Sequence, residues 1–281
     1  MEYDNRRAAS GRWELAMLTR FAITRRADDD GVDALVAERD YVLAHVVAQL
    51  HRAKPTDGGQ LVFKGGTALR LVHIGDYRYS ADLDFTIIGG SASAATASII
   101  EVLNAARDHA GIPVLELTDV GNRIAYVGPL EARKPRLLKL DISDTEVVAT
   151  VEQRTILSGM WSDLPEALPI AVYSIDEIAA EKLRCIIQRV ECRDLYDIFR
   201  LVEDMGVSLD EVCLLFEQKA TAKGLDPATF ADKFADRINR YKGRWDREMS
   251  DHLAEPPQFD DVVRVVRVVR RHLRAAELLR S

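Results

Sequence analysis

Two aspartates in a short apolar run are the side chains of this sequence best suited to carry out chemistry. Asp82 and Asp84 are separated by one residue within 81–88, a run of strand-forming composition. Because side chains alternate along a strand, both carboxylates lie on one face, and Leu83 and Phe85 lie on the opposite, apolar face. Two such carboxylates suit Mg²⁺ or Mn²⁺, which take oxygen ligands and commonly bridge carboxylates to substrate phosphates. Taken alone, an Asp-x-Asp pair is more often an exposed polar strand face, so its neighbours decide its meaning.

A pair of glycines ahead of these aspartates is suited to bind phosphate. Gly65 and Gly66 precede 68–73, a segment that is predicted to form a short helix. Backbone N–H groups at a helix N-terminus attract phosphate oxygens, and residues that lack a Cβ atom let the anion approach closely. The pair by itself would also fit a tight turn. Its position just before the Asp82 strand favours a site that binds a nucleotide and a metal ion together.

A lysine in the C-terminal half of the chain could complete such a site. Lys182 lies in 178–184, where apolar and polar residues alternate with the period of a helix. A cation on a well-packed helix could reach a cleft and neutralise charge on the phosphates of a bound nucleotide. The alternative is an ordinary surface pair of Glu181 and Lys182.

Four segments of the chain, in this order, resemble the DNA polymerase β-like nucleotidyltransferase superfamily. They are more closely similar to the AbiEii-type nucleotidyltransferase toxins of bacterial toxin–antitoxin systems. The segments are 63–69, 80–85, 174–183 and 193–198. One position departs from the superfamily pattern, because Gly66 stands where a serine usually follows the first glycine.

The resemblance implies roles for particular residues. The catalytic set that it implies is Asp82, Asp84, Lys182 and Asp197. The nucleotide-binding set that it implies is Lys64, Gly65, Gly66, Thr67, Ser80 and Lys182. In this set the hydroxyl of Thr67 would replace that of the missing serine. Asp197 is expected to accept a proton or to position the nucleophile, and Arg193 and Asp194 to orient it or to bridge the two halves of the chain.

A third metal-binding carboxylate is usual in the superfamily. Asp141, in the strand-like run 136–142, is the candidate that would join the two aspartates of the Asp-x-Asp pair. Glu116 and Asp144 stay open as alternatives. A metal ion held only by the Asp-x-Asp pair and the triphosphate is also open.

The resemblance implies an enzyme that transfers a nucleoside monophosphate from a nucleoside triphosphate to RNA and releases pyrophosphate. The implied acceptor is the 3′ end of tRNA, the implied effect is a block of translation, and the implied partner is a cognate antitoxin encoded nearby. Two alternatives remain open. One is a small molecule or a protein side chain as acceptor, because the phosphate and metal motifs do not specify the nucleophile. The other is a non-enzymatic nucleotide- or protein-binding module, against which the joint presence of the four catalytic residues argues.

A stripe of arginines near the C-terminus is the densest basic surface that the sequence predicts. These arginines recur every three or four residues beside a parallel apolar stripe, which is the pattern of an amphipathic helix. They are Arg264, Arg267, Arg271 and Arg274. The net charge of −7 opposes general binding to nucleic acid, so RNA would need a local basic face of this kind. The alternatives are that the stripe is only solvated, and that RNA docks near Arg6, Arg7, Arg25 and Arg26.

The order of predicted elements favours an α/β (α+β) fold, with a mixed sheet and flanking helices followed by a helical second lobe. N-terminal helices are predicted up to about residue 55. From about residue 175 the apolar residues again recur with the period of a helix. Strands are predicted at 61–64, 81–88, 114–117, 123–127 and 136–142, with a helix over 92–110. We therefore expect a nucleotidyltransferase lobe over 1–170, and a helical lobe over 171–281 that completes the active site.

Composition places the chain among ordinary globular proteins, since 47% of its 281 residues are hydrophobic and 30% are charged. The N-terminus lacks the apolar core of a signal peptide, and no run of about 18 apolar residues occurs, so we expect no membrane segment and a cytoplasmic protein. Cys185, Cys192 and Cys213 lack the spacing of a metal site or a redox pair. They are expected to be reduced thiols in the core.

Overall fold

The computed structural model describes residues 18–110, 114–118, 122–166 and 168–278. In these residues the chain forms a mixed seven-stranded sheet of order β3-β4-β5-β2-β1-β7-β6. The strands are β1 (Gln60–Lys64), β2 (Asp82–Ile88), β3 (Val114–Thr118), β4 (Arg123–Tyr126), β5 (Arg136–Ser143), β6 (Val151–Arg154) and β7 (Ile170–Tyr173). At the centre of the sheet, β2 runs antiparallel to β1 and parallel to β5.

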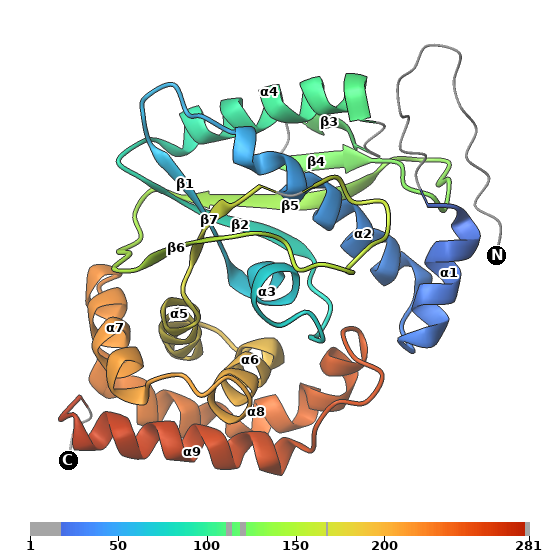
Figure 1. The fold of residues 1–281 in the computed structure, drawn as a ribbon. Coiled ribbons are helices and arrows are strands. Elements are labelled where there is room, and N and C mark those ends of the chain that lie inside the picture. The colour runs from blue at the N-terminus through green and yellow to red at the C-terminus, as the bar shows by residue number, and fades with distance from the viewer. Residues whose placement is uncertain (1–17, 111–113, 119–121, 167, 279–281) are drawn as a thin grey trace, which may run out of the picture.

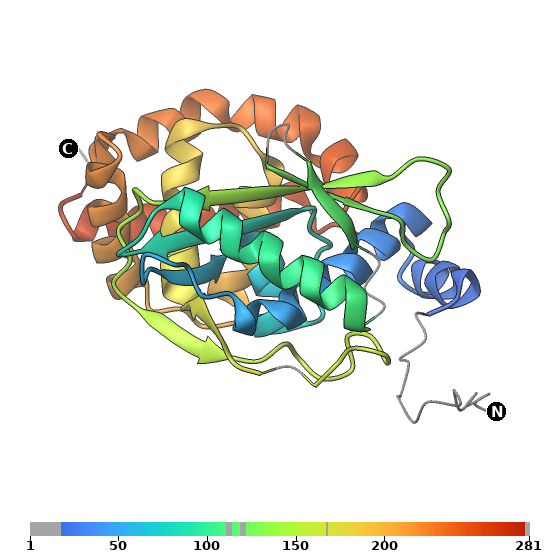
Figure 2. The same ribbon diagram turned by 90° about the horizontal axis from the view of Figure 1, so that it is seen from above.

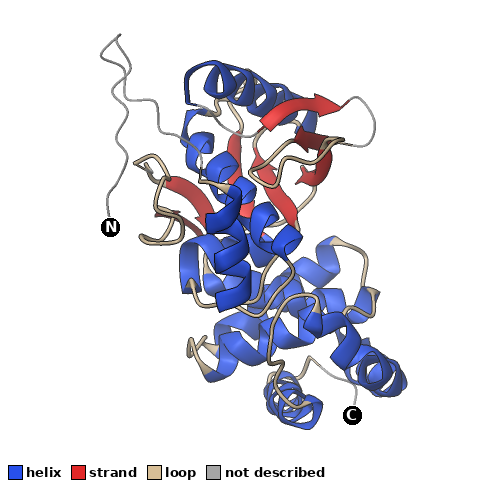
Figure 3. Ribbon diagram, turned by 90° about the vertical axis from the view of Figure 1, so that its right-hand side faces the viewer, coloured by secondary structure: helices blue, strands red, loops and turns tan. Residues whose placement is uncertain are grey.

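Helices lie on both sides of this sheet. The helices are α1 (Arg20–Asp29), α2 (Ala34–Gln49), α3 (Gly65–Ala68), α4 (Ala92–Ala110), α5 (Ile175–Gln188), α6 (Cys192–Glu203), α7 (Leu209–Ala222), α8 (Phe230–Ser250) and α9 (Phe259–Ala275). The short helical segments are η1 (Leu50–Arg52), η2 (Leu69–Ile74) and η3 (Pro227–Thr229). Helix α4 crosses one face of the sheet, and α5 to α9 gather on the opposite side (Figures 1 and 2). The strands therefore occupy one half of the molecule, and the other half is helical (Figure 3).

The predicted fold class is confirmed, and the predicted helix over 92–110 coincides with α4. Each strand predicted up to residue 142 is present within one or two residues. The sequence pattern did not predict β6 or β7, because β6 is short and polar, and β7 is a short apolar run just before the segment predicted to be helical from about residue 175. β7 pairs with β1, so the sheet extends across residue 170, where we placed the boundary between the two lobes. The division into two domains remains a prediction.

Helix α5 is the element that carries the second half of the site. The side chain of Ser174 accepts a hydrogen bond from the backbone N–H of Glu177, and two acidic residues occupy the first turn, where they oppose the positive end of the dipole. Most of α5 is buried because it lies between the sheet and the remaining helices. This extensive burial fixes the rotation of the helix and therefore the direction of Lys182.

The central strands carry apolar side chains on one face and polar side chains on the other. Phe63 and Phe85 are buried and lie side by side, with ring centroids 5.2 Å apart. Lys64 follows Phe63 and Asp84 precedes Phe85, and this second pair points to the opposite face by alternation. Alternation along the strands thus places charged groups on the side of the sheet that faces α5.

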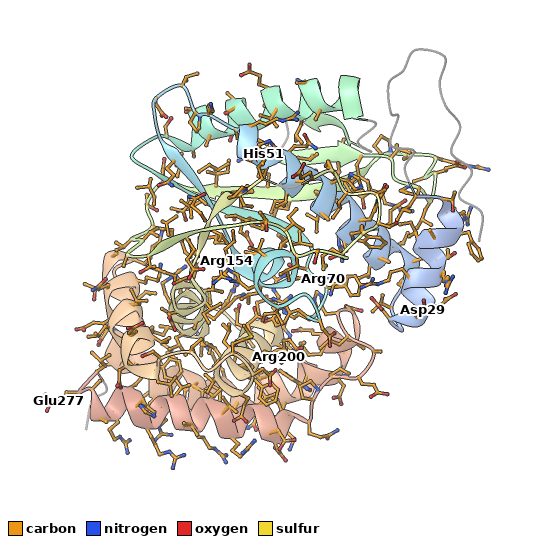
Figure 4. All side chains as sticks on the ribbon, viewed as in Figure 1. Asp29, His51, Arg70, Arg154, Arg200 and Glu277 are labelled. Atoms are coloured by element: carbon orange, nitrogen blue, oxygen red, sulfur yellow. The ribbon has the colours of Figure 1, made fainter. Side chains whose placement is uncertain are left out.

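Buried polar contacts tie the short helical segment after β1 to its surroundings. Arg70, labelled in Figure 4, lies on η2 and is buried, and its Nε atom is 2.5 Å from Oδ1 of Asp40 on α2. The indole N–H of Trp161 donates to the other oxygen of Asp40 at 3.2 Å. These contacts hold η2, and with it the glycine turn that precedes it.

The three cysteines are buried and not in disulfides, as predicted. Within the part of the chain that the structure describes, no helix is long and apolar enough to span a membrane.

A buried lysine joins the sheet half to the helical half away from the candidate site. The Nζ atom of Lys219 on α7 is 2.5 Å from Oε2 of Glu177 and donates to the backbone carbonyl of Val147 at 2.8 Å. The other carboxylate oxygen of Glu177 accepts hydrogen bonds from the backbone N–H groups of Ala149 and Thr150. The segment between β5 and β6 is therefore held by charged groups of α5 and α7.

We expect Lys219→Ala to lower the free energy of unfolding by about 3–5 kcal/mol, because it leaves the carboxylate of Glu177 buried without its cation. Urea denaturation followed by circular dichroism would measure this loss. Lys233→Ala, at an exposed position on α8, is the matched control and should change stability by less than about 0.5 kcal/mol. Equal effects of the two substitutions would show that the Lys219–Glu177 pair does not stabilise the fold. The double variant Lys219→Met/Glu177→Gln should recover part of the loss, since it removes both buried charges.

Candidate active site

The candidate site is a cavity of about 280 Å³ between the polar face of the sheet and helix α5. Eight of the residues predicted to form the site line it. They are Lys64, Gly65, Gly66, Ser80, Asp82, Asp84, Asp141 and Lys182. Thr67 and Asp197 are not among the described lining residues. The structure therefore brings the glycine turn, the Asp-x-Asp strand and the helical lysine to one place.

The acidic wall of the cavity is a row of side chains across three neighbouring strands. Asp84 on β2 is paired with Lys64 on β1 and with Asp141 on β5. Asp82 lies two residues before Asp84, on the same face, and is paired with Lys139. Burial, together with the negative charge of Asp82, raises the pKa of Asp84 to about 6. The two carboxylates therefore repel each other unless a cation binds beside them.

Both glycines of the turn are required by close contacts with the site. Gly65 begins α3 with φ at 78°, and a Cβ atom on it would lie 2.6 Å from Oδ2 of Asp84. A Cβ atom on Gly66 would lie 2.5 Å from Nη2 of Arg78. The guanidinium group of Arg78 thus occupies the space where the serine of the superfamily pattern would begin, which explains why glycine stands at this position.

Thr67 has a different place from the one predicted. Its side chain is buried, and its hydroxyl group donates to the backbone carbonyl of Asp82 at 2.5 Å. This bond ties α3 to β2 and so fixes the glycine turn against the Asp-x-Asp strand. The hydroxyl group is engaged there, and it supports the shape of the site from behind.

Glu181 and Lys182 do not pair with each other, although they are adjacent in sequence. Glu181 accepts a hydrogen bond from Nζ of Lys64 at 3.0 Å and lies 3.5 Å from a guanidinium nitrogen of Arg184. Burial opposes the charge of Glu181, but Lys64 and Arg184 lower its pKa to about 2. The alternative of a Glu181–Lys182 surface pair is therefore not what the structure shows.

Lys182 lies in a buried cluster of charged side chains that forms the opposite wall of the cavity. Its Nζ atom is 2.7 Å from Oδ2 of Asp197 and 3.1 Å from Oδ1 of Asp194. Arg78 holds both oxygens of Asp197 at 2.6 and 2.7 Å. Arg189 holds both oxygens of Asp194 at 2.9 and 3.1 Å. Each carboxylate is thus shared by Lys182 and one arginine.

The members of this cluster stay charged although they are buried. Burial alone would raise the pKa of Asp197, but Arg78 and Lys182 hold it well below its usual range. Burial alone would lower the pKa of Lys182, but Asp197 and Asp194 raise it above its ordinary value. Three cations therefore share two carboxylates, and the cluster carries one surplus positive charge. An uncompensated charge in a buried cluster favours binding of an anion beside it.

Asp197 is fully enclosed within this cluster. Besides Arg78 and Lys182, the phenol group of Tyr77 donates to its Oδ1 atom at 2.6 Å. A carboxylate with a strongly lowered pKa and three donors is a poor proton acceptor. Its geometry suits the positioning of Lys182, which is the cavity-lining partner.

Arg193 connects the two walls of the cavity. It lies in the first turn of α6, and its Nη1 atom is 3.5 Å from Oδ2 of Asp82 on β2. The prediction that Arg193 bridges the two halves of the chain agrees with this contact. Asp194, predicted to orient Asp197, instead shares Lys182 with it.

The third carboxylate is the least complete part of the site. Asp141 is paired with Asp84 across the strands, but its side chain is 56% exposed and lies 3.1 Å from Nζ of Lys139. Asp144 is exposed after the end of β5, and the side chain of Glu116 lies outside the described residues. Among the residues that the structure describes, no group of three or more His, Cys, Asp or Glu side chains is arranged to hold a metal ion. The donor set fits a metal ion held by the Asp-x-Asp pair with phosphate oxygens as further ligands.

The predicted arginine stripe lies on a separate surface. The apolar face of α9, which includes Val262, Val266 and Leu273, is buried against α6, α7 and α8. The side chains on the free edge of α9 point away from the protein (Figure 4). A surface hollow there is lined by Arg264, Arg267, Arg270, Arg271 and Arg274. None of these arginines lines the cavity between the sheet and α5.

The alternative RNA-docking residues Arg6 and Arg7 lie outside the described residues, and Arg25 on α1 is exposed and paired with Asp29.

Sequence reasoning missed two arginines of the charged cluster. Arg78 could have been found, because Arg78, Ser80, Asp82 and Asp84 follow one another at intervals of two and so continue the polar strand face backwards. Arg189 had no comparable signal, since it follows the last residue of α5 and its partner Asp194 lies on the next helix.

Comparisons with solved structures agree with the fold. In solved structures, the chain is similar to MenT4, a nucleotidyltransferase toxin from Mycobacterium tuberculosis H37Rv, with a TM-score of 0.66 and 19% identity over 92% of this chain and 90% of that one. It also matches an antigenic nucleotidyltransferase-like protein from Paracoccidioides brasiliensis, with a TM-score of 0.40 and 18% identity over 72% of this chain and 93% of that one. The second likeness is too weak to support an argument. No curated protein matches the chain.

The comparison with protein families covers most of the chain. Residues 49–265 match the AbiEii family, described as "Nucleotidyl transferase AbiEii toxin, Type IV TA system". The matched range includes the glycine turn, both walls of the cavity and the first part of α9. The chain therefore belongs to the AbiEii nucleotidyltransferase toxin family of type IV toxin–antitoxin systems.

Proposed function

We propose that the protein transfers a nucleoside monophosphate from a nucleoside triphosphate to the 3′ end of an RNA, and that tRNA is the acceptor. The observation that carries this proposal is the pairing of two walls of opposite charge across one cavity. Asp82 and Asp84 supply negative charge from the sheet, and the cluster around Lys182 supplies surplus positive charge from the helices. A triphosphate with its metal ion carries charges of both signs and fits between such walls.

Asp82 and Asp84 are the residues that would hold Mg²⁺. The raised pKa of Asp84 and the closeness of Asp82 indicate a place where a cation stabilises both carboxylates. Bound there, the metal ion would supply charge neutralisation at the reacting phosphate and lower the pKa of the attacking hydroxyl group. Asp141 is positioned to contact the same region from β5 and stays part of the proposal as a third ligand.

The chain's own residues bind and orient the triphosphate. The backbone at Gly65 and Gly66 is free of Cβ atoms where a phosphate group would approach, and Ser80 and Lys64 lie on the same wall. The ammonium group of Lys182 has three N–H donors. Among the described side chains, Asp194 and Asp197 accept two of them, which leaves the third for the cavity. We assign Asp197 the role of fixing Lys182 in this direction.

In the reaction, the 3′-hydroxyl oxygen of the acceptor forms a bond to the α-phosphorus, the bond from that phosphorus to the pyrophosphate breaks, and the hydroxyl proton is released. Positive charge beside the leaving pyrophosphate stabilises the negative charge that develops on it. The buried, fixed cluster around Lys182 is suited to this task, since its donors need no reorganisation during the reaction.

RNA is favoured as acceptor by the basic surface of α9. A net-acidic chain repels a polyanion at long range and needs a local basic face to bind one. That face lies apart from the cavity, so only an acceptor large enough to reach both surfaces could use it. A small-molecule acceptor has no need of it. Modification of the tRNA 3′ end in the cytoplasm would block translation, and a cognate antitoxin would control this activity.

We expect Asp82→Asn and Asp84→Asn each to reduce transfer to RNA by more than about 100-fold, since even loss of an outer-shell partner of a metal ligand costs about 10- to 100-fold. The melting temperature should stay equal or rise, because each change removes like-charge repulsion. Labelled nucleoside triphosphates, Mg²⁺ and total RNA would be used to measure transfer. Asp246→Asn, at an exposed position on α8, is the control. Transfer at the wild-type rate by either site variant would refute the metal assignment.

Lys182→Met and Asp197→Asn should have different effects on binding and folding. Lys182→Met leaves two arginines paired with two carboxylates, so the fold should persist while nucleotide affinity falls about 10- to 100-fold, as expected for a charged hydrogen bond. Asp197→Asn leaves Arg78 and Lys182 short of a carboxylate, and should destabilise the protein by about 3–5 kcal/mol. Titration calorimetry with a non-hydrolysable triphosphate and urea denaturation would separate the two. Unchanged nucleotide affinity of Lys182→Met would remove Lys182 from the site.

Charge reversal on α9 tests the acceptor. Arg267→Glu combined with Arg271→Glu should weaken tRNA binding and reduce the salt dependence of log K by about one unit per lost phosphate contact, with nucleotide affinity unchanged. Arg240→Glu combined with Arg247→Glu, at exposed positions on α8, changes net charge equally and is the matched control. If both pairs weaken tRNA binding to the same extent, the α9 surface is not a specific RNA contact.

A further inference from the structure

Arg189 stands out among the charged residues of the cavity because it is fixed and exposed at once. Two of its nitrogens, Nε and Nη2, donate to Asp194 at 2.9 and 3.1 Å. Its side chain nevertheless keeps 45% of its surface exposed and lines the cavity. Arg78, which holds Asp197 in the same two-point manner, has only 1% of its side chain exposed. Of the two arginines of the cluster, Arg189 is therefore the one that a ligand in the cavity can contact readily.

The donors of Arg189 are only partly used. Guanidinium has five N–H donors in a planar fork. Among the described residues, no acceptor pairs with its Nη1 atom, which carries two of them. The two bonds to Asp194 fix the plane of the group. An anion that arrives at Nη1 therefore meets a donor that is already oriented, so little side-chain entropy is lost on binding.

A shared carboxylate oxygen sets the distance between Arg189 and Lys182. Oδ1 of Asp194 accepts from Nζ of Lys182 at 3.1 Å and from Nη2 of Arg189 at 3.1 Å. The two cationic groups therefore lie no further apart than twice that distance. Two donors within this distance can both contact one polyphosphate chain, whose neighbouring phosphate groups offer several oxygens to them.

The net charge of the cluster also favours binding of an anion at Arg189. Lys182, Arg78 and Arg189 share only Asp194 and Asp197, which leaves one positive charge without a carboxylate. Because Arg189 is the most exposed member, this charge is available at the cavity surface and not within the core. An anion bound at Arg189 would balance the cluster.

We propose that Arg189, held in place by Asp194, binds the terminal phosphates of the nucleotide together with Lys182 and stabilises the departing pyrophosphate. This inference rests on the proposed function and names the residue pair that recognises the leaving group. Asp194 acts as the positioning residue for both cations. Arg189 is thus assigned to the triphosphate and not to the backbone of the acceptor RNA.

Arg189→Gln is the variant that tests the proposal. It leaves two cations with two carboxylates, so the protein should fold with an unchanged or higher melting temperature. We expect the dissociation constant for inorganic pyrophosphate, and for a non-hydrolysable nucleoside triphosphate, to rise about 10- to 100-fold. The dissociation constant for the nucleoside monophosphate and the KM for RNA should stay within about twofold of the wild-type values, less than the effect of any one lost hydrogen bond. Arg154→Gln on β6, which does not line the cavity, is the matched control.

The outcomes separate this inference from the proposed function. Wild-type protein that binds pyrophosphate and nucleotide, with Arg189→Gln binding them equally well, would overturn the role of Arg189 and leave the proposed function intact. An effect of Arg189→Gln on the KM for RNA alone would overturn it in favour of an acceptor contact. Equal weakening of monophosphate and pyrophosphate binding would also overturn it, since Arg189 would then contact the phosphate that is transferred. Wild-type protein that binds neither nucleotide nor pyrophosphate would refute both proposals.

Discussion

The buried ionic cluster around Lys182 is the interaction on which the rest of the site depends. Charged groups are taken out of water only when they are paired and hydrogen-bonded, because desolvation otherwise outweighs their attraction. Here each carboxylate, on Asp194 and Asp197, is shared between Lys182 and an arginine. Arg78 comes from the segment before β2, and the other members come from α5, α6 and the short link between them. The cluster therefore forms only when the sheet half and the helical half of the chain have come together, so folding and assembly of the site are one event.

The sheet contributes the other half of the charge pattern. Alternation on β2 places two carboxylates toward the cavity and two apolar side chains toward the core, and pairing with β1 and β5 adds Lys64 and Asp141 in the same row. The glycine turn has to pass close to this row, and Gly65 has no room for a side chain beside Asp84. One wall thus attracts a cation and the other attracts an anion. A metal-bound triphosphate is the ligand whose own charges match that division.

The two proposed binding surfaces lie apart in the structure. The cavity lies between the sheet and α5, whereas the basic surface of α9 lies on the outer side of the helical half. The apolar stripe of α9 is used for packing on α6, α7 and α8, and this packing turns the arginines outward. The same amphipathic pattern therefore serves both the core and the basic surface. Substitutions on the basic surface of α9 can therefore leave the cavity undisturbed.

Local sequence determined those features that depend on periodicity and backbone chemistry. Alternation was enough to place Asp82 and Asp84 on one face, helical period was enough to predict α4 and the two faces of α9, and the two glycines marked the start of α3. The resemblance of four motifs indicated the AbiEii family, and the comparison with protein families confirmed it. These features are set within a few residues of one another.

Partnerships between charged side chains were decided only by the tertiary structure. Nothing near Asp197 in the sequence shows that Tyr77, Arg78 and Lys182 enclose it, and nothing near Thr67 shows that its hydroxyl group is taken by the backbone of Asp82. The short strands β6 and β7 form because β1 and the following chain offer them a partner, and not because their own composition demands it. A side chain's role in this site depends on which distant groups satisfy its hydrogen bonds and its charge, and that is settled when the two halves close on each other.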